Sequence, residues 1–393
     1  MTIIIFIIVL FVLVLVHEFG HFLAAKFFGM KVEEFGIGFP PRIVSIKKGE
    51  TRYSLNFLPL GGFVKILGEE GEGADDPRSY SSRPAWQKSS VLVAGVVMNF
   101  LLAVGIFWIT FTIGYPATIE KDMANSPTIR SVQILDVAPQ SPAKIAGIEM
   151  GDTVIRIMNN ELGIKREMNH PTPKAQGLDV VRFSPAFIPP LKAEGILGGS
   201  KITNSDELQT FINKNKGKVL TLVIKRGDQT LEKTVLARKN PPKGEGSIGI
   251  SLADVGLIRY PWYSAFFHAW IWAFQTLWFI AYSLFLVIKT LFTQGRAIGE
   301  VAGPIGLASM VGKFYSLGIS YFFAFVGTIS LSLSFFNTLP IPALDGGHLL
   351  FVVIEKVKGS PVKRELEQKL HTLGFAILLT FMLIITIHDI LKL

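Results

Sequence analysis

The sequence contains no cysteine, and only 18% of its 393 residues are charged. Without cysteine there can be no disulfide, no thiolate nucleophile and no zinc site built from thiolates. Because 49% of the residues are hydrophobic, the chain is too apolar for an ordinary soluble protein, and we expect a membrane protein with a soluble part. The net charge of +9 is more typical of cytoplasmic loops than of a nucleic-acid surface, so we expect no nucleic-acid partner.

The N-terminus also lacks the features of a cleaved signal peptide, because no cationic region precedes its apolar run and no small-residue cleavage site follows it. We therefore expect this run to remain as a helix. Segments long and apolar enough to span about 30 Å of hydrocarbon lie at about 2–28, 91–115, 320–338 and 371–388. The region of about 120–250 is polar with strand-like runs, which indicates a soluble domain.

The orientation follows from the basic residues. Lysine and arginine gather in the loop after the first span and in the loop before the last span, so both loops are expected to be cytoplasmic and the region 120–250 extracytoplasmic. With both basic loops on the cytoplasmic side, a fifth apolar segment, 262–292, cannot cross the membrane once. Its tryptophans and tyrosines suit the membrane interface, where we expect it to lie or to dip in and return. An ordinary fifth span is the alternative, and it would move one basic loop to the other side.

His17, Glu18 and His21 form an H-E-x-x-H pattern inside the first apolar segment. An ionisable residue near the bilayer centre costs about 3 kcal/mol, so such residues indicate function. On a helix, residues i and i+4 lie about 40° apart around the axis, so both imidazoles can converge on one Zn²⁺ ion that keeps a position open for water. Glu18 is placed to take a proton from that water, as in metalloproteases. The alternative is a pair of helix-interior histidines with a glutamate partner.

Asp345 is the expected third ligand. It is an isolated acidic residue at the end of an apolar segment, in the stretch "FFNTLPIPALDGGHLL" at 335–350. The Pro-x-Pro before it is expected to break the helix, and the Gly-Gly after it permits close backbone approach. Taken alone, this pattern could be an interfacial turn, but H-E-x-x-H in the same chain favours a ligand.

The remaining histidines are expected to stay off the metal. His348 is expected to support a ligand or to cap a helix, with metal ligation as the alternative. The others lack partners at ligand spacing: His170, His268, His371 and His388.

Between the first two spans, the stretch around 40–68 alternates apolar and polar residues, with turn signals at Lys48-Gly49 and Gly61-Gly62. This pattern predicts short β-hairpins joined to the membrane domain.

H-E-x-x-H in the first span, combined with N-x-x-P-x-P-x-L-D-G-G-H downstream, resembles the site-2 protease family of intramembrane zinc metalloproteases. The likeness covers residues 1–393 and is strongest to the bacterial RseP-type group with an extracytoplasmic PDZ domain. The downstream motif consists of Asn337, Pro340, Pro342, Leu344, Asp345, Gly346, Gly347 and His348. The resemblance implies Zn²⁺ held by His17, His21 and Asp345, with Glu18 as the general base.

The resemblance also implies residues that hold the substrate. Asn337 would help to hold an extended substrate backbone, and Asn99 in "AGVVMNF" would have a polar role near the site. The loop "GGFVKILGE" resembles a membrane-associated β-region that presents the substrate as an added strand. Its expected substrate-binding residues are Gly62, Phe63, Val64, Lys65 and Ile66.

The soluble region resembles a PDZ domain through "VAPQSPAKIAGIEMGDTVIRIMNNEL", and only one such domain is evident. An insertion at about 163–200 interrupts the pattern. Two positions depart from the family in ways that bear on substrate grip: Val96 stands where members often have proline, and Ser332 where many have asparagine.

The expected fold class is an α-helical membrane protein with four transmembrane helices, a cytoplasmic-side membrane-associated β-region and an extracytoplasmic PDZ (α+β) domain. The chain is expected to begin with a first transmembrane helix with H-E-x-x-H at 1–28, a cytoplasmic-side loop with β-hairpins at 29–88 and a second transmembrane helix at 89–117. The PDZ domain at 120–250 and interfacial or re-entrant amphipathic helices at 259–317 are expected to follow. The last segments are a third transmembrane helix at 318–339, the LDGGH motif and a cytoplasmic loop at 340–370, and a fourth transmembrane helix at 371–390.

The expected function is regulated intramembrane proteolysis in a bacterial inner membrane. The substrates would be single-span membrane proteins in the lipid bilayer, either anti-sigma factors or remnant signal peptides, after a first extracytoplasmic cut and with their ectodomains screened by the PDZ domain. A metal-binding scaffold without turnover is one alternative, disfavoured because a metal carrier needs no base such as Glu18 beside its ligands. A metal transporter is another, for which more intramembrane acids would be expected.

Overall fold

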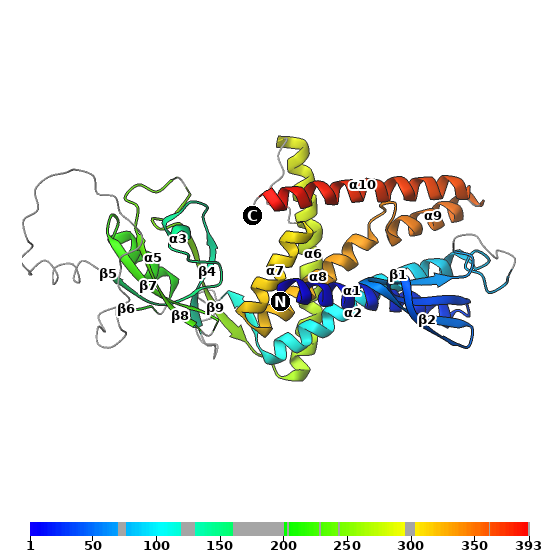
Figure 1. Cartoon of the computed structure of the whole chain (residues 1–393), viewed down its shortest axis with the longest axis horizontal. Coiled ribbons are helices and arrows are strands. Elements are labelled where there is room, and N and C mark those ends of the chain that lie inside the picture. The colour runs from blue at the N-terminus through cyan, green and yellow to red at the C-terminus, as the bar shows by residue number, and fades with distance from the viewer. Residues whose placement is uncertain are drawn as a thin grey trace, which may run out of the picture. The chain divides into compact units, whose positions relative to one another are not determined.

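The apolar segments and the polar region fold separately. The structure, a computed structural model, divides into two compact units, Met1–Tyr115 with Arg259–Leu393 and Pro116–Ile258 (Figure 1). It describes residues 1–69, 76–118, 130–159, 200–202, 204–227, 229–242, 244–294, 303–360 and 362–391. The expected insertion at 163–200 lies outside these residues, apart from Ser200.

Long helices form most of the first unit. They are α1 (Thr2–Phe27), α2 (Ala85–Ile113), α6 (Trp262–Gln294), α7 (Pro304–Leu317), α8 (Ile319–Thr338), α9 (Asp345–Lys358) and α10 (Arg364–Leu391). By length and composition, α1, α2, α6, α8 and α10 could each cross a membrane. Many of their large apolar side chains are exposed, which water would penalise and lipid would not. The expectation of a membrane protein is confirmed at this level.

Small residues bring α1, α2 and α8 close together, as is common where helices pack in lipid. A Cβ at Gly20 of α1 would collide with the carbonyl of Ala94 in α2, and one at Gly327 of α8 would come within 2.9 Å of Phe107. Two hydroxyls of α8 also donate to backbone carbonyls of α2: Ser330 Oγ to Asn99 O at 2.8 Å and Ser334 Oγ to Val96 O at 3.0 Å. This face of α8 therefore looks toward α2.

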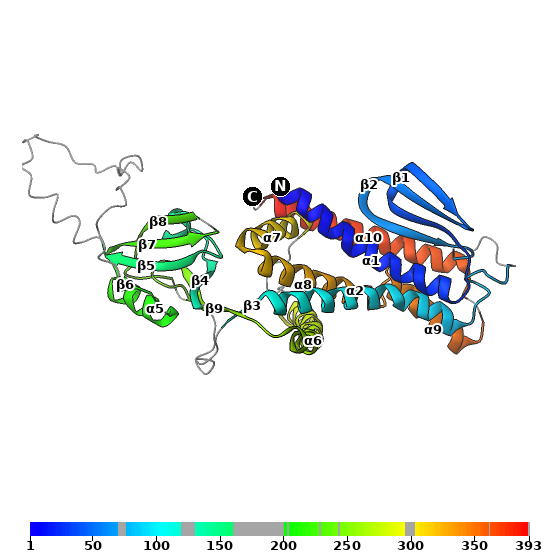
Figure 2. The same cartoon turned by 90° about the horizontal axis from the view of Figure 1, so that it is seen from below.

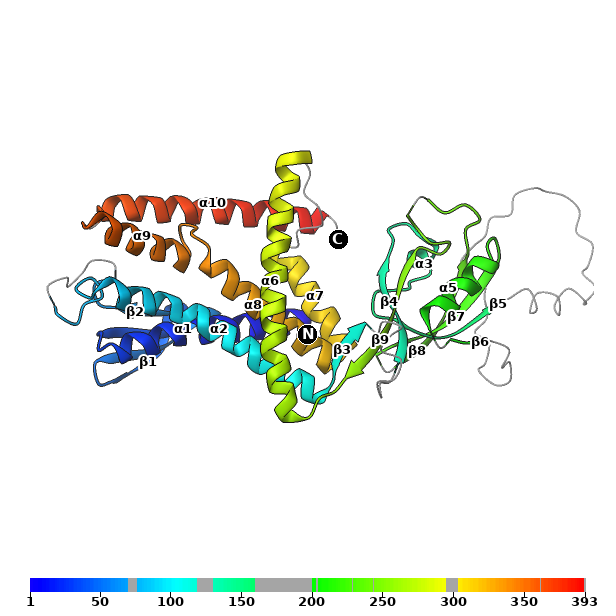
Figure 3. The same cartoon turned by 180° about the vertical axis from the view of Figure 1, so that it is seen from behind.

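The segment expected at the membrane interface forms one helix, α6, with no reversal between Trp262 and Gln294. Its buried alanines, at helical spacing, pack in one cluster with Ala103 and Phe107 of α2: Ala265, Ala269 and Ala273. Figure 1 shows α6 running across α1, α2 and α10, and Figure 2 shows it nearly end-on while they are seen from the side. Figure 3 shows its full length from behind. Helix α6 is thus oriented differently from the other candidate spans.

The loop after α1 forms two long strands, β1 (Val32–Lys48) and β2 (Thr51–Ile66). The turn between them contains Gly49, as expected, whereas Gly61-Gly62 lies inside β2 and makes no hairpin turn. Gly61 has a φ of +133°, a value open to glycine, and β2 changes its pairing there. Phe35 pairs with both Tyr53 and Val64, so the first half of β1 lies between two parts of β2.

The hairpin turn is fastened to the end of α1. Lys26 Nζ and Arg78 Nη1 both donate to the Glu50 carboxylate at 2.9 Å. These bonds, that of Lys26 above all, hold the pKa of Glu50 below its usual range. The hairpin is thereby held beside the helix that carries His17 and His21.

The second unit is built on a sheet with the strand order β3-β9-β4-β5-β7-β8, in which β6 pairs with β5. The strands are β3 (Tyr115–Thr118), β4 (Arg130–Val137), β5 (Thr153–Asn159), β6 (Ser200–Lys201), β7 (Val219–Arg226), β8 (Gln229–Leu236) and β9 (Ile250–Ile258). Among its described residues, the sheet is accompanied by α3 (Pro142–Ile145) and α5 (Ser205–Lys214). Alternate residues of β7 enter the core, where Leu208 and Ile212 of α5 meet them. This unit has its own apolar core.

Candidate metal centre

His17 and His21 lie one turn apart on α1, and both are buried. Their Nε2 atoms are 3.1 Å apart. His21 Nδ1 lies 2.8 Å from the Val91 carbonyl of α2, which can only accept a hydrogen bond. Nδ1 must therefore carry the ring proton, and the Nε2 lone pair of His21 is left facing His17.

Asp345, the first residue of α9, meets the two histidines. Its Oδ2 lies 2.9 Å from His17 Nε2 and 3.5 Å from His21 Nε2. Helix α8 ends at Thr338, before the prolines, as expected. A Cβ at Gly346 or Gly347 would collide with the carbonyls of Leu339 and Ile341. The two glycines therefore permit the close backbone approach expected from the sequence, and the tight turn brings Asp345 to α1.

The three donor atoms fit a zinc ion. With bonds of about 2.0–2.1 Å, a tetrahedral zinc site places its ligand atoms about 3.3 Å apart, and the observed separations run from 2.9 to 3.5 Å. Asp345 Oδ2 is buried and has no hydrogen-bond partner in the part of the chain that the structure describes. This carboxylate oxygen receives no hydrogen bond from the described residues and faces two imidazole nitrogens. A bound cation would satisfy all three atoms as its ligands.

Two asparagines lie beside His17. Asn99 Nδ2 of α2 is 3.3 Å from His17 Nδ1, and Asn337 Nδ2 of α8 is 3.4 Å from His17 Nε2. Asn337 lies one turn beyond Ser334 on the face of α8 that looks toward α2. Asn99 is fully buried, and its Oδ1 has no partner among the described residues.

Glu18 lies outside the cluster of three ligand atoms and faces the second part of β2. A Cβ at Gly62 would be 3.6 Å from Glu18 Cγ, and the Val64 backbone lies near the Glu18 carboxylate. Phe63 instead packs against Gly36. Of the segment's last two residues, Lys65 Nζ lies 3.5 Å from Glu33 Oε2, and Ile66 is buried in a separate apolar cluster. Within the segment 62–66, the backbone near Gly62 and Val64 therefore lies beside Glu18.

Gly95 has no role that its sequence context predicts, although the structure places it against the site. A Cβ at Gly95 would be 2.5 Å from His21 Nε2 and 2.8 Å from His17 Cε1. A glycine inside a helix lowers helix stability by about 1 kcal/mol relative to alanine. A glycine within an apolar span is therefore a sequence signal for a close contact at that position. His348 does not join the cluster and stacks on His371 of α10 instead, with ring centroids 3.8 Å apart.

Comparisons with known proteins extend over nearly the whole chain. The model of peptidase family M50 matches residues 5–381. A Clostridium perfringens protein named as a zinc metalloprotease is 32% identical over 379 residues, which are 96% of this chain and 95% of its own. The regulator of sigma-E protease RseP of Escherichia coli K12 is 27% identical over 436 residues, covering 98% and 97%. The regulator of sigma E protease of Haemophilus influenzae is 27% identical over 435 residues, covering 99% and 98%.

Proposed function

Because the chain belongs to peptidase family M50, the site-2 protease family, and is a zinc metalloprotease, we propose that it cleaves single-span membrane proteins within the lipid bilayer. The family, the enzyme class and the zinc cofactor expected from the motifs are confirmed. One observation carries the proposal: two buried histidines and Asp345 converge within a few ångströms, with a carboxylate beside them, on an apolar helix. Groups of this kind in lipid are retained for function.

We propose His17 Nε2, His21 Nε2 and Asp345 Oδ2 as the zinc ligands. When bound, zinc polarises the scissile carbonyl and lowers the pKa of the attacking water. Glu18 accepts the proton of that water and passes it to the leaving amine, so the carboxylate is regenerated in each cycle. Asn337 donates its amide N–H to the substrate backbone beside His17.

Asn99 is proposed to set the tautomer of His17. A ligand nitrogen at Nε2 requires the ring proton at Nδ1, and that proton needs an acceptor. The orphaned Asn99 Oδ1 supplies one if the side-chain amide is rotated by half a turn, because amide oxygen and nitrogen occupy nearly equivalent positions. The rotation satisfies both Asn99 Oδ1 and His17 Nδ1.

The second part of β2 is proposed as the substrate-binding edge. A helical substrate must unwind before its carbonyls can reach the site, and the freed backbone groups then need partners. Within the described residues, β1 pairs with one side of Gly62–Ile66, and an added strand on the other side would run beside Glu18. The backbone contact between Val64 and Glu18 supports this location.

The remaining expectations are also proposals. We propose four spans, α1, α2, α8 and α10, in a bacterial inner membrane, with α6 at the interface and the second unit acting as an extracytoplasmic PDZ domain. An open groove of about 620 Å³ beside α5, lined in part by Ile202 and Phe211, is its candidate peptide site. Relatives named as regulators of sigma-E protease support substrates such as anti-sigma factors or remnant signal peptides, already cut once outside.

The test is Glu18→Gln, which keeps the side chain's size but removes its capacity to act as a base. We expect bound zinc, an unchanged fold and cleavage of single-span proteins reduced about 100-fold or more. Zinc content and a cleavage assay on purified full-length protein measure both, and membrane proteomics of cells identifies the uncut fragments. Glu232→Gln, on an exposed part of β8, is the matched control. Near-normal cleavage by Glu18→Gln would contradict the mechanism.

A further inference from the structure

The loop between α8 and α9 has a strained residue two positions before Asp345. Ala343 has a φ of +79°, a left-handed conformation that residues with a Cβ seldom adopt. Such a conformation persists only where the surroundings hold it. The Ala343 backbone N–H donates to His371 Nδ1 of α10 at 2.9 Å, so a side chain from the last helix holds the strained residue.

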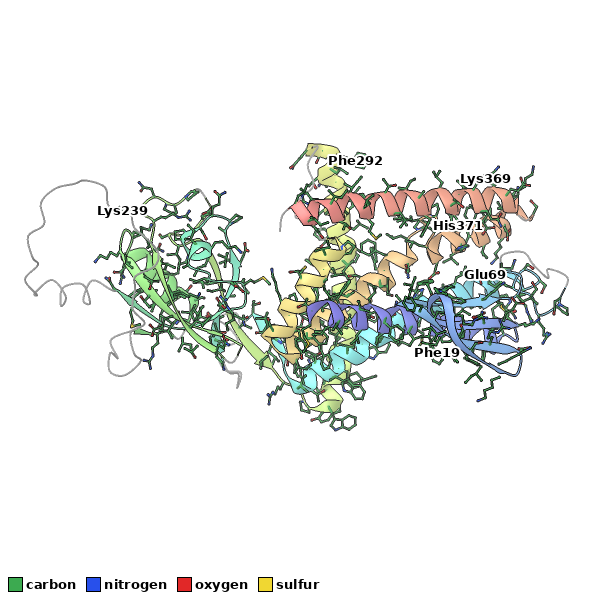
Figure 4. All side chains as sticks on the ribbon, in the orientation of Figure 1. Phe19, Glu69, Lys239, Phe292, Lys369 and His371 are labelled. Atoms are coloured by element: carbon green, nitrogen blue, oxygen red, sulfur yellow. The ribbon has the colours of Figure 1, made fainter. Side chains whose placement is uncertain are left out.

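Helix α10 contacts the same loop at a second point. Gly374 lies three residues after His371, on the same face of the helix. A Cβ at Gly374 would come within 2.6 Å of both the Cβ and the carbonyl oxygen of Pro342. The helix backbone therefore lies directly against Pro342, while His371 reaches Ala343, and the two contacts grip consecutive residues of the loop. Figure 4 labels His371 on α10.

The His371 ring is itself fixed by α9 and α10. It stacks on His348 with an interplanar angle of 16°, and it packs against Phe351 with centroids 5.4 Å apart. Glu367 Oε1 lies 3.6 Å from His348 Nδ1. Because Nδ1 of His371 accepts from Ala343, the ring proton is on Nε2. The stack thus sets the orientation in which His371 can accept.

His348, Glu367 and His371 are close enough together to suggest a second metal site, but their geometry argues against it. A metal lies in the ring plane of each imidazole that ligates it. The two rings are nearly parallel and stacked, so an ion in the plane of one ring would lie well outside the plane of the other. His371 Nδ1 is also already engaged by Ala343. The cluster is better suited to holding the loop.

We propose that His371 and Gly374 are positioning residues for Asp345. They hold Pro342 and Ala343 so that Asp345 Oδ2 stays within reach of both histidines, which makes zinc affinity depend on where α10 lies. The inference rests on the proposed ligand set of His17, His21 and Asp345. It extends the metal site to a helix that provides no ligand.

The first experiment measures Zn²⁺ affinity of the full-length protein by competition with a chelating dye. We expect His371→Ala to weaken zinc binding about 10-fold, as loss of a residue supporting a metal ligand typically does. His371→Asn keeps an acceptor, Oδ1, at the position of Nδ1, and should stay within about threefold of the wild type. A merely structural loss of the ring would affect both variants alike. No loss in His371→Ala, or an equal loss in His371→Asn, overturns the proposal.

The second experiment tests the loop backbone. Gly374→Ala should weaken zinc binding, whereas Gly105→Ala, a helical glycine with open space around its Cβ position, should not. Adding Ala343→Gly to His371→Ala should restore part of the affinity, because glycine adopts the left-handed conformation without being held. Equal affinities for the two glycine variants, or no restoration, contradict the proposal. If His371→Ala does not fold, Gly374→Ala and His371→Asn carry the test.

Asp345→Ala separates this inference from the proposed function. If Asp345→Ala binds zinc as tightly as the wild type, the ligand set is wrong and the positioning role falls with it. If Asp345→Ala weakens binding while the His371 and Gly374 variants do not, only the positioning role is overturned. If Asp345→Ala, His371→Ala and Gly374→Ala all bind zinc more weakly while His371→Asn keeps its affinity, the ligand set and the positioning role are both supported.

Discussion

Gly95 of α2 is the residue that leaves room for the two imidazoles. Its missing Cβ would stand 2.5 Å from His21 Nε2, a separation that only a shift of the ring or of the helix could relieve. His21 is also tied to α2 through the Val91 carbonyl, so its ring has little freedom to move away. The absence of a side chain at Gly95 is therefore part of the ligand geometry.

We predict that Gly95→Ala weakens zinc binding about 10-fold or more and lowers cleavage with it, because the added methyl displaces ligand nitrogens. Gly105→Ala on the same helix adds the same methyl where nothing lies within 4 Å. It should bind zinc normally and unfold at the same or a slightly higher temperature. Dye competition and thermal unfolding of both purified variants measure this. Wild-type zinc affinity in Gly95→Ala would show that the imidazoles can move to accommodate the methyl group, and would contradict the prediction.

At this scale, residues can be predicted from the sequence where the signal is local. His17 and His21 converge because of their spacing on one helix, and Asp345 stood out as an isolated acid. Gly95, Val91 and His371 could not be assigned in this way, because their contacts depend on how α2 and α10 pack against other segments. His371 is expected to stay off the metal, and its contact with the left-handed Ala343 depends on how α10 packs against the loop between α8 and α9.

At the scale of elements, the alternation pattern predicts only some features of β2. Alternation of apolar and polar residues predicted a β-region and the turn at Gly49, but Gly61-Gly62 was also interpreted as a turn. A Gly-Gly pair permits either a turn or a bend within a strand. The choice depends on pairing with β1, as in the double pairing of Phe35. That pairing leaves the second part of β2 beside Glu18.

We predict that Val64→Pro lowers cleavage about 10-fold or more while zinc stays bound. Proline removes the backbone N–H at an edge position and disrupts strand addition there. Val64→Ala shortens the side chain but keeps the N–H, and should cleave within about threefold of the wild type. Cleavage rates and zinc content of the two variants separate the backbone from the side chain. Equal rates for both would remove the strand edge from the proposal.

At the scale of the whole molecule, length and composition give five candidate spans among the residues that the structure describes, whereas the basic loops predict four. Composition alone does not distinguish a helix that crosses the bilayer from one that lies in its plane. The orientation of α6 across α1, α2 and α10 (Figures 1 and 2) favours the plane. Exposed tryptophans along the helix, Trp262 at its start and Trp278 at its middle, also suit a helix that lies at the interface.

The absence of cysteine permits a direct test of this topology with single-cysteine variants. We predict that a membrane-impermeant maleimide labels Glu232→Cys in right-side-out vesicles. It should label Lys48→Cys and Lys358→Cys only after the vesicles are opened. The unsubstituted chain, which cannot react through a thiol, is the control. Labelling of Lys48→Cys or Lys358→Cys from outside would mean that α6 crosses the membrane.

The second unit is proposed to select substrates rather than to take part in the chemistry. The ligand atoms, Glu18 and β2 all lie in the first unit, and the chain leaves and re-enters that unit at neighbouring points: the Tyr260 N–H donates to the Phe111 carbonyl at 3.0 Å. A short Gly-Ser linker can therefore replace Pro116–Ile258 without straining α2 or α6.

We predict that this deletion spares Glu18-dependent cleavage but relaxes substrate choice. A PDZ domain that admits small extracytoplasmic remnants and hinders bulky ones would make the intact enzyme prefer a trimmed substrate. The assay compares full-length and trimmed forms of one single-span substrate, with the intact and the deleted enzyme, and Glu18→Gln in each as the control. The ratio of the two cleavage rates should fall toward one on deletion, with zinc content unchanged. An unchanged preference for the trimmed form would place the selection in the first unit, where the approach to the β2 edge would have to discriminate instead.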